Sequence, residues 1–238
     1  MPQSSKSPSH SVHLELESLE ERCVLSTAAY VTALYVDLLH RVPAASEMLG
    51  WVNSINDGAA QVPNGLSPAA AAGAFTSGPE YLSDTVRAAY QLYLNRTPAP
   101  SEAASWVAVL QNGLPETQFQ AAILASDEFF AQSGGSAYPW LNSVYLKALG
   151  RLGAQAELDG WNQLLQSGAS RQAVAFDIVT SPEGDTRLVN AAYQALLGRA
   201  PDPAGLAGWV GQLQRGMTPS QLIAAIIGSA ETLGRAGG

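Results

Sequence analysis

Residues 191–216 read AAYQALLGRAPDPAGLAGWVGQLQRG, and four of their positions recur three times upstream. In each copy an arginine follows a tyrosine by six residues, a tryptophan follows the arginine by ten, and a glycine follows the tryptophan by seven. The matching positions are Tyr35, Tyr90, Tyr145 and Tyr193; Arg41, Arg96, Arg151 and Arg199; Trp51, Trp106, Trp161 and Trp209; and Gly58, Gly113, Gly168 and Gly216. No gap interrupts these spacings, so the chain is a tandem repeat protein.

The repeats differ in length because two of them carry insertions. The repeat tyrosines are separated by 55, 55 and 48 residues, and the short value is the basic period. Turn-like residues mark the insertions AAQVPNGL, residues 59–66, and AQSGGSAYP, residues 131–139, where we expect loops. The expected organisation is a mobile leader over residues 1–27 and repeats over 28–84, 85–136, 137–186 and 187–238. A glutamate closes each repeat: Glu80, Glu128, Glu183 and Glu231.

Each repeat reads as three helices. The first ends before the arginine, at residue types that tolerate a left-handed backbone: His40, Asn95, Gly150 and Gly198. The second carries the tryptophan on an apolar face at offsets i, i+3, i+4 and i+7. The third carries an apolar pair four residues apart: Ala71/Phe75, Phe119/Ile123, Val174/Ile178 and Leu222/Ile226.

The predicted fold class is therefore all-α, with four tandem three-helix repeats of about 48–55 residues. Twelve main helices are expected, plus a weak one around residues 14–24. The sequence leaves open whether they pack as an extended helical array or as a compact bundle.

Composition and charge exclude several classes of protein. Of the 238 residues, 47% are hydrophobic, which is ample for a core. The formal net charge of −8 argues against binding to nucleic acid or to anionic lipid, which requires a basic surface. The single cysteine, Cys23, cannot form an intramolecular disulfide or a thiolate zinc site. No apolar run is long enough for a transmembrane segment.

Residues 191–231 closely resemble the bacterial domain-of-unknown-function 4214 family. They share its tyrosine, Leu-Gly-Arg, Pro-Asp, Gly-Leu and tryptophan in this order. The other repeats match more loosely, with alanine at Ala44, Ala99 and Ala154 where the last has Asp202. The resemblance covers roughly residues 28–234. It implies tandem helical modules, often in exported or surface proteins and distantly similar to phycobilisome linker domains. The family has no established catalytic activity and supplies no functional residues.

The N-terminal stretch LELESLEERCVLS, residues 14–26, is similar to a short motif near the start of many exported and cell-surface bacterial proteins. This similarity implies export. The acidic stretch after Lys6 lacks the apolar segment of an ordinary secretory signal, so a cytoplasmic location stays open.

The repeated side chains allow two interpretations each. The tryptophans either pack in the core or stack on sugar rings. The arginines either satisfy carbonyls at helix ends and pair with the repeat glutamates, or form an array of contacts to anions or a partner. Each tyrosine is expected to pack its ring and to find one partner for its hydroxyl.

Catalytic chemistry has little support in the sequence. His10 and His13 lie in the leader and His40 fills a helix-end slot, so no two histidines share a helix face as a metal site would need. The one weak functional candidate is Asp177, because the equivalent positions in the other repeats are alanine. It either faces solvent or marks a site unique to the third repeat. We predict no catalytic, cofactor-binding or metal-binding residues and no cofactor.

These observations favour a non-enzymatic scaffold or protein-interaction module, exported or at the cell surface, with an unidentified protein partner. Arrays of helical repeats usually act through their surfaces. The alternative is a module that binds carbohydrate or a small ligand in grooves between repeats.

Overall fold

The computed structural model describes residues 27–55 and 65–229. These residues form helices and their connections and contain no β-strand, so the all-α prediction is confirmed. Ile55 and Leu66 form an isolated bridge between two connecting segments. The expected helix around residues 14–24 lies outside the described residues.

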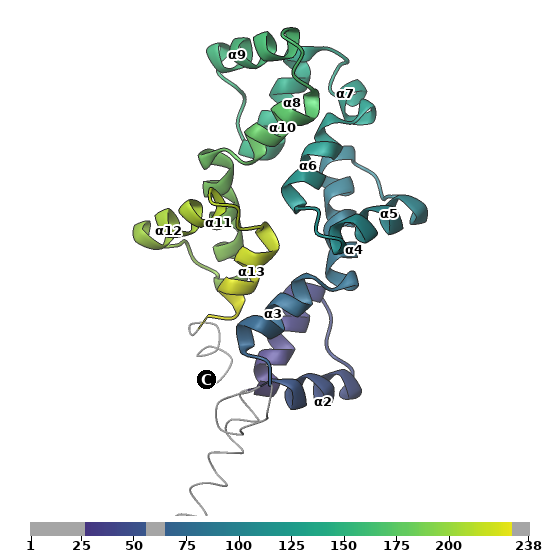
Figure 1. Ribbon diagram of the computed structural model, residues 1–238, viewed down its shortest axis with the longest axis vertical. Helices are drawn as coiled ribbons and strands as arrows, with labels where there is room; N and C mark the ends of the chain where they lie inside the picture. Colours follow the sequence, from purple (N-terminus) through teal and green to yellow (C-terminus); the bar gives the residue numbers. More distant parts are fainter. Residues whose placement is uncertain (1–26, 56–64, 230–238) are drawn as a thin grey trace, which may run out of the picture. The chain divides into compact units, whose positions relative to one another are not determined.

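The chain divides into two compact units. Unit 1 comprises residues 1–74 with 227–238, and unit 2 comprises residues 75–226. The helices follow a first helix over residues 27–39 (Figure 1). They are α2 (Ala45–Ser54), α3 (Pro68–Thr76), α4 (Pro79–Ala89), the π-helical turn η1 (Tyr90–Leu94), α5 (Pro100–Gln111), α6 (Glu116–Ala125), α7 (Asp127–Gln132), α8 (Ala137–Leu149), α9 (Gln155–Gln166), α10 (Arg171–Val179), α11 (Pro182–Leu197), α12 (Pro203–Leu213) and α13 (Pro219–Ile227).

Three helices recur in every repeat, and the second insertion adds a fourth. The expected loop over residues 131–139 is largely wrong, because α7 runs to Gln132 and α8 already begins at Ala137. Only the residues between them connect the two helices, and they include Gly134 and Gly135 at φ values of 98° and 68°. A backbone of this kind is open mainly to glycine, so this pair splits what is one continuous helix, α11, in the fourth repeat.

The predicted helix ends are confirmed where the structure describes them. The residues before the repeat arginines are all left-handed, with φ values of 54° at His40, 53° at Asn95, 75° at Gly150 and 67° at Gly198. The glycines that end the tryptophan helices are also at positive φ, namely Gly113, Gly168 and Gly216. Gly58, the first of that set, lies outside the described residues.

The third helix of each repeat supplies the core. All four predicted apolar pairs are buried, with Ala71, Phe119 and Leu222 fully inaccessible to solvent. In unit 2, α6 and α10 pack against each other, so repeats 2 and 3 share one hydrophobic core that runs from Leu82 to Ile178. The last repeat contributes a separate cluster that contains Val189, Leu213 and Leu222.

Unit 1 is built around the first helix and α3. Tyr30, Val31 and Leu34 are almost inaccessible to solvent, as are Ala71 and Ala72 of α3. The hydroxyl of Tyr30 donates a hydrogen bond of 2.8 Å to the carbonyl of Pro68, at the start of α3. This bond joins the first helix to α3, and it gives the buried hydroxyl the partner that it would otherwise lack.

Candidate functional site

A tyrosine–tryptophan pair is present in all four repeats. The indole Nε1–H donates to the tyrosine hydroxyl sixteen residues earlier. The distances are 3.2 Å for Trp51 to Tyr35, 3.0 Å for Trp106 to Tyr90, 2.7 Å for Trp161 to Tyr145 and 2.9 Å for Trp209 to Tyr193. The indoles are half-buried, and Trp106 lies 4.8 Å from the ring of Phe119. Each pair therefore fastens the tryptophan helix to the helix before it.

The repeat arginines lie over the rings of the same tyrosines. The guanidinium carbons are 4.6 Å from the ring centre of Tyr35, 4.9 Å from Tyr90, 5.2 Å from Tyr145 and 5.3 Å from Tyr193. Each distance falls within the range of an attractive cation–π contact. This stacking was not predicted from the sequence. The constant six-residue offset between tyrosine and arginine was the pattern that indicated it.

The same arginines bind carboxylates. In the first three repeats two guanidinium nitrogens contact the glutamate six residues later, with both distances 2.8 Å for Arg96 and Glu102 and for Arg151 and Glu157. A second glutamate, 32 residues after the arginine, binds Arg96 as Glu128 and Arg151 as Glu183. The predicted pairing with repeat glutamates is thus present in repeats 2 and 3, while Glu231 of the last repeat lies outside the described residues.

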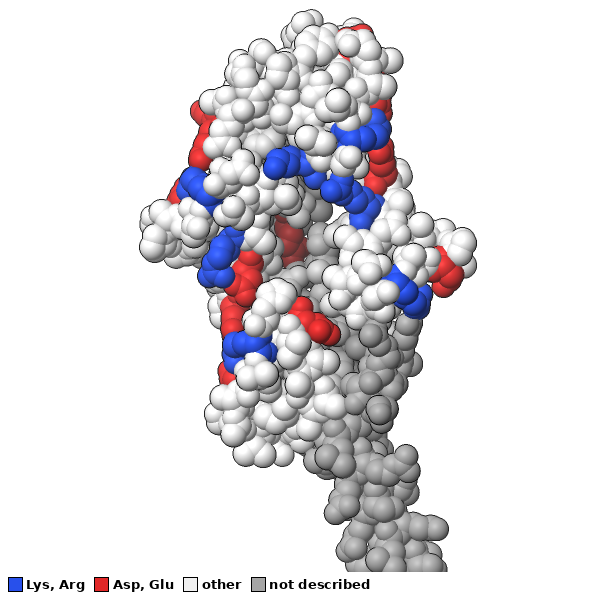
Figure 2. Space-filling model, turned by 180° about the vertical axis from the view of Figure 1, so that it is seen from behind, with Lys and Arg blue, Asp and Glu red and all other residues white. Residues whose placement is uncertain are grey.

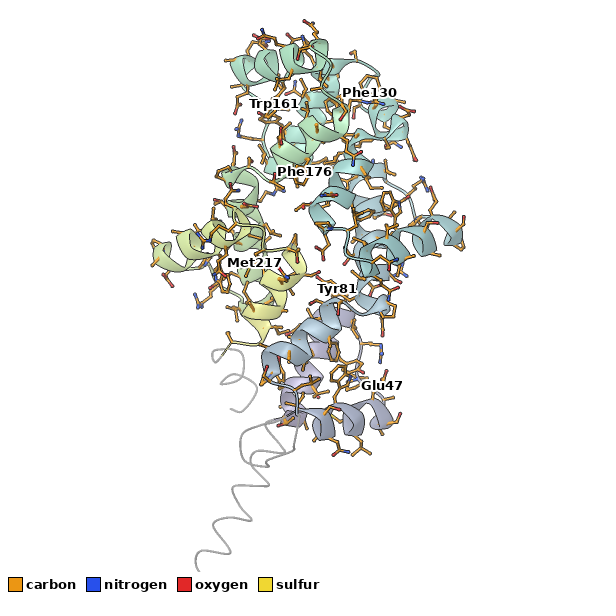
Figure 3. The ribbon with its side chains drawn as sticks, viewed as in Figure 1. Glu47, Tyr81, Phe130, Trp161, Phe176 and Met217 are labelled. Carbon is orange, nitrogen blue, oxygen red and sulfur yellow. The ribbon has the colours of Figure 1, made fainter. Side chains whose placement is uncertain are left out.

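The nearer glutamate also caps the tryptophan helix. Glu157 accepts a 2.7 Å hydrogen bond from the backbone N–H of Ala154, and Glu47, labelled in Figure 3, does the same for Ala44. The fourth repeat has Gly205 at this position, and Asp202 at the N-cap accepts from the Gly205 N–H at 2.9 Å instead. The carboxylate that holds the helix start has therefore moved from the third helical residue to the cap.

We call each set of tyrosine, tryptophan, arginine and nearer carboxylate a repeat cluster. Hydrogen bonds from Arg151, and then from the Ala154 N–H, lower the pKa of Glu157 from its ordinary 4.5 to about 2. The corresponding bonds from Arg96 and Ala99 have the same effect on Glu102. Both carboxylates are ionised near neutral pH and already engaged, so a repeat cluster satisfies itself and holds its helices together.

Acid is expected to weaken the repeat clusters. Because the pKa of Glu157 is lower in the folded chain than in the unfolded one, its contribution is complete above its ordinary pKa and is lost as the pH falls from about 5 to about 2. The urea midpoint should fall over this range, and Glu157→Gln should flatten the fall. Asp177→Asn, at an exposed position, is the matched control. An unchanged pH profile in Glu157→Gln would contradict this role.

A different kind of site lies in unit 2, where Figure 2 shows a hollow bordered by basic and acidic side chains. Two cavities of about 300 Å³ and 200 Å³ adjoin there, and both are lined by Thr117 of α6 and Asp185 of α11. The larger cavity is bordered by Phe176 and Met217, both labelled in Figure 3, and the smaller one by Lys147 and Arg187. We call the two cavities together the hollow.

Asp185 is the buried charge of the hollow, with 5% of its surface exposed. It accepts a hydrogen bond from the side-chain amide of Gln214, which also donates 2.8 Å to the carbonyl of Thr180. Burial raises the pKa of Asp185, and the bond from Gln214 opposes that rise in part. Asp185 was not predicted from the sequence. The pattern that indicated it is a carboxylate eight residues before the repeat tyrosine, where the other repeats have Thr27, Leu82 and Ala137.

Two basic side chains lie at the smaller cavity. Lys147 donates 2.6 Å to the carbonyl of Leu92, which leaves further donors on its ammonium. The guanidinium of Arg187 lies against Gly150, where a Cβ atom would come within 1.8 Å of it. Within residues 27–55 and 65–229, Arg187 forms no hydrogen bond or ion pair.

Comparison with known proteins identifies the family of the C-terminal half. The model of the family described as domain of unknown function (DUF4214) matches residues 120–188 and 183–236. Residues 120–236 belong to the DUF4214 family. No curated protein and no solved structure matches the chain. The DUF4214 matches contain the repeat clusters of Tyr145 and Tyr193, and the same geometry at Tyr35 and Tyr90 extends the architecture beyond the matched residues.

The remaining candidates lie outside the hollow. Asp177 is exposed on α10 of the DUF4214 region and is not among the residues that line either cavity. His40 occupies the end of the first helix, while His10, His13 and Cys23 lie outside the described residues. In the part of the chain that the structure describes, no three histidine, cysteine, aspartate or glutamate side chains gather as a metal site would require.

Among residues 27–55 and 65–229, every helix is too short or too polar to be a transmembrane segment.

Proposed function

We propose that the protein is a non-enzymatic scaffold that binds another protein at the cell surface or outside the cell. The observation that carries this proposal is the self-contained chemistry of the repeat clusters. Their indole donors, carboxylates and guanidinium groups are engaged with each other, as in Trp161, Glu157 and Arg151. The repeated residues therefore maintain the array, and recognition falls to the outer surface. The resemblance of residues 14–26 to an export motif supports the location.

Repeat 3 offers a candidate surface. Leu146 on α8, Leu152 before α9 and Leu164 on α9 are 51%, 64% and 46% exposed. Large apolar side chains exposed within one module favour contact with another protein. The last repeat exposes none of the large apolar residues that the structure describes.

The test is affinity capture from an envelope extract with the full chain and with a Leu152→Gln, Leu164→Gln variant. The expected result is one protein recovered by the wild type and reduced at least about tenfold by the variant, as loss of roughly 1.4 kcal/mol of binding energy would give. Circular dichroism should show equal helix content in both chains. A wild type that recovers nothing above empty beads, or a partner retained equally by the variant, would contradict the proposal.

Binding of a small ligand between repeats is a second candidate function, and the hollow favours it. Residues from α6, α8, α10, α11 and the α12–α13 connection converge there, so the hollow belongs to repeats 2, 3 and 4 together. Its charged residues are not repeated, since the positions equivalent to Arg187 are Ala29, Asp84 and Pro139. A feature unique to one register is typical of a specific site rather than of the shared architecture.

The carbohydrate form of this alternative draws less support from the tryptophans. Their N–H groups are already donated to tyrosines, and Trp106, Trp161 and Trp209 pack against the hydrophobic clusters of unit 2. A glycan array probed with wild type and Trp106→Phe tests it. Glycan binding lost in the substituted but folded chain would restore the sugar-stacking interpretation.

A further inference from the structure

The hollow combines three chemical environments in two cavities that share Thr117 and Asp185 in their walls. Asp185 supplies a buried carboxylate where the two cavities adjoin. Lys147 and Arg187 supply positive charge in the smaller cavity only. Phe176 and Met217 supply apolar surface in the larger cavity only. The three environments differ in sign and polarity, and each lies in a separate part of the hollow.

A matching ligand carries three complementary groups. A cationic group suits Asp185, an anionic group suits Lys147 and Arg187, and an apolar body suits the larger cavity. Charge-assisted hydrogen bonds of this kind are stronger than neutral ones, and a guanidinium can hold a carboxylate with two donors. The larger cavity, of about 300 Å³, is at the lower end of the range for small-molecule sites. The ligand is therefore small.

We infer that the hollow binds a free α-amino acid with a large apolar side chain. Its carboxylate lies against Arg187 and Lys147, its ammonium against Asp185, and its side chain in the larger cavity beside Phe176 and Met217. This inference rests on the second proposed function, small-ligand binding, and names its ligand class. Arg187 is the residue best suited to the carboxylate, because none of its donors is engaged by the described residues.

The arrangement of Gln214 fits this assignment. Its amide holds one side of Asp185 and is itself fixed by the carbonyl of Thr180. The carboxylate is thereby oriented before any ligand binds. This reduces the entropy that the Asp185 side chain loses on binding. The amide of Gln214 is neutral, so the charge of the buried Asp185 is not balanced by it. A ligand's ammonium group in the hollow would supply the opposite charge.

Isothermal titration calorimetry of the full chain tests the inference with L-phenylalanine, phenethylamine and 3-phenylpropanoate. Phenethylamine lacks the carboxylate and 3-phenylpropanoate lacks the ammonium. Each is expected to bind at least about tenfold more weakly than L-phenylalanine, since one charge-assisted contact is lost in each case. L-Lysine, whose side chain would place a charge in the apolar cavity, is expected to bind more weakly by a similar factor.

Substitution distinguishes the assigned site from other positions. Arg187→Gln is expected to lower the affinity for L-phenylalanine at least about tenfold and to leave the affinity for phenethylamine unchanged. Only L-phenylalanine has a carboxylate that Arg187 can contact. Arg215→Gln, at another exposed arginine in unit 2 that lines neither cavity, is the matched control and should leave binding unchanged. Both positions are exposed, so both variants should fold.

Two results would overturn the inference. The first is the absence of binding heat and of amide NMR shifts with L-phenylalanine at millimolar concentration. The second is equal affinity for L-phenylalanine and phenethylamine together with no effect of Arg187→Gln. In the second case the hollow still binds a small ligand and only the amino-acid assignment fails, so the two levels of the proposal are separated.

Discussion

Trp140→Ala is expected to lower the free energy of unfolding by about 4–5 kcal/mol, near the top of the range for a buried tryptophan. Trp140 is fully inaccessible to solvent, and its indole N–H donates 2.7 Å to the carbonyl of Leu124. Its ring also lies 6.5 Å from that of Phe130. The substitution therefore leaves a large cavity and a buried carbonyl without its donor. Urea unfolding followed by circular dichroism measures the loss.

Two further substitutions on α8 serve as controls for that result. Trp140→Phe keeps most of the apolar volume and removes the N–H, so it should cost less than Trp140→Ala by at least about 2 kcal/mol. Leu146→Ala, at a position that is 51% exposed on α8, should change stability by no more than about 0.5 kcal/mol. A loss below about 1 kcal/mol for Trp140→Ala would show that this ring does not support the core.

Trp161→Ala is expected to cost about 2–3 kcal/mol, less than the substitution of Trp140 because the indole of Trp161 is only half-buried. The loss combines its packing against the core of repeats 2 and 3 with its 2.7 Å hydrogen bond to Tyr145. The measurement is again urea unfolding. Leu164→Ala on the same helix, 46% exposed, is the matched control and should stay within about 0.5 kcal/mol of wild type.

A double-mutant cycle separates the two contributions. Trp161→Phe and Tyr145→Phe each remove one partner of the same hydrogen bond, so their effects should not add. The expected coupling energy is about 1 kcal/mol, the net value of a typical hydrogen bond in a protein. Additive effects would mean that the hydrogen bond does not couple the two side chains. A near-zero effect of Trp161→Ala would mean that the indole does not stabilise the fold and is available to bind a ligand.

The periodic features of this fold were accessible from sequence because each rests on a local rule. His40 and Asn95 were recognised as helix ends since few residue types tolerate a left-handed backbone, and both are left-handed. The i, i+4 pairs of the third helices were recognised from their spacing, and Phe119 with Ile123 is buried as expected.

The features that escaped prediction depend on tertiary contacts. Trp140 stands outside the repeat register, so its full burial did not follow from any pattern. Asp185 and Arg187 are brought to Lys147 by the packing of α11 against α8, which no spacing along the chain encodes. Asp177 was singled out because the equivalent positions in the other repeats are alanine. The same comparison of repeats, made eight residues later, would have found Asp185.

The repeat clusters have a consequence for how the chain is made. The contacts from tyrosine to tryptophan, from arginine to the nearer glutamate, and from that glutamate to the cap span 16, 6 and 3 residues, as in the cluster of Tyr145. Local contacts of this kind form quickly and need no distant segment. Each repeat cluster can therefore form while the nascent chain is still leaving the ribosome, before the following repeat has been translated.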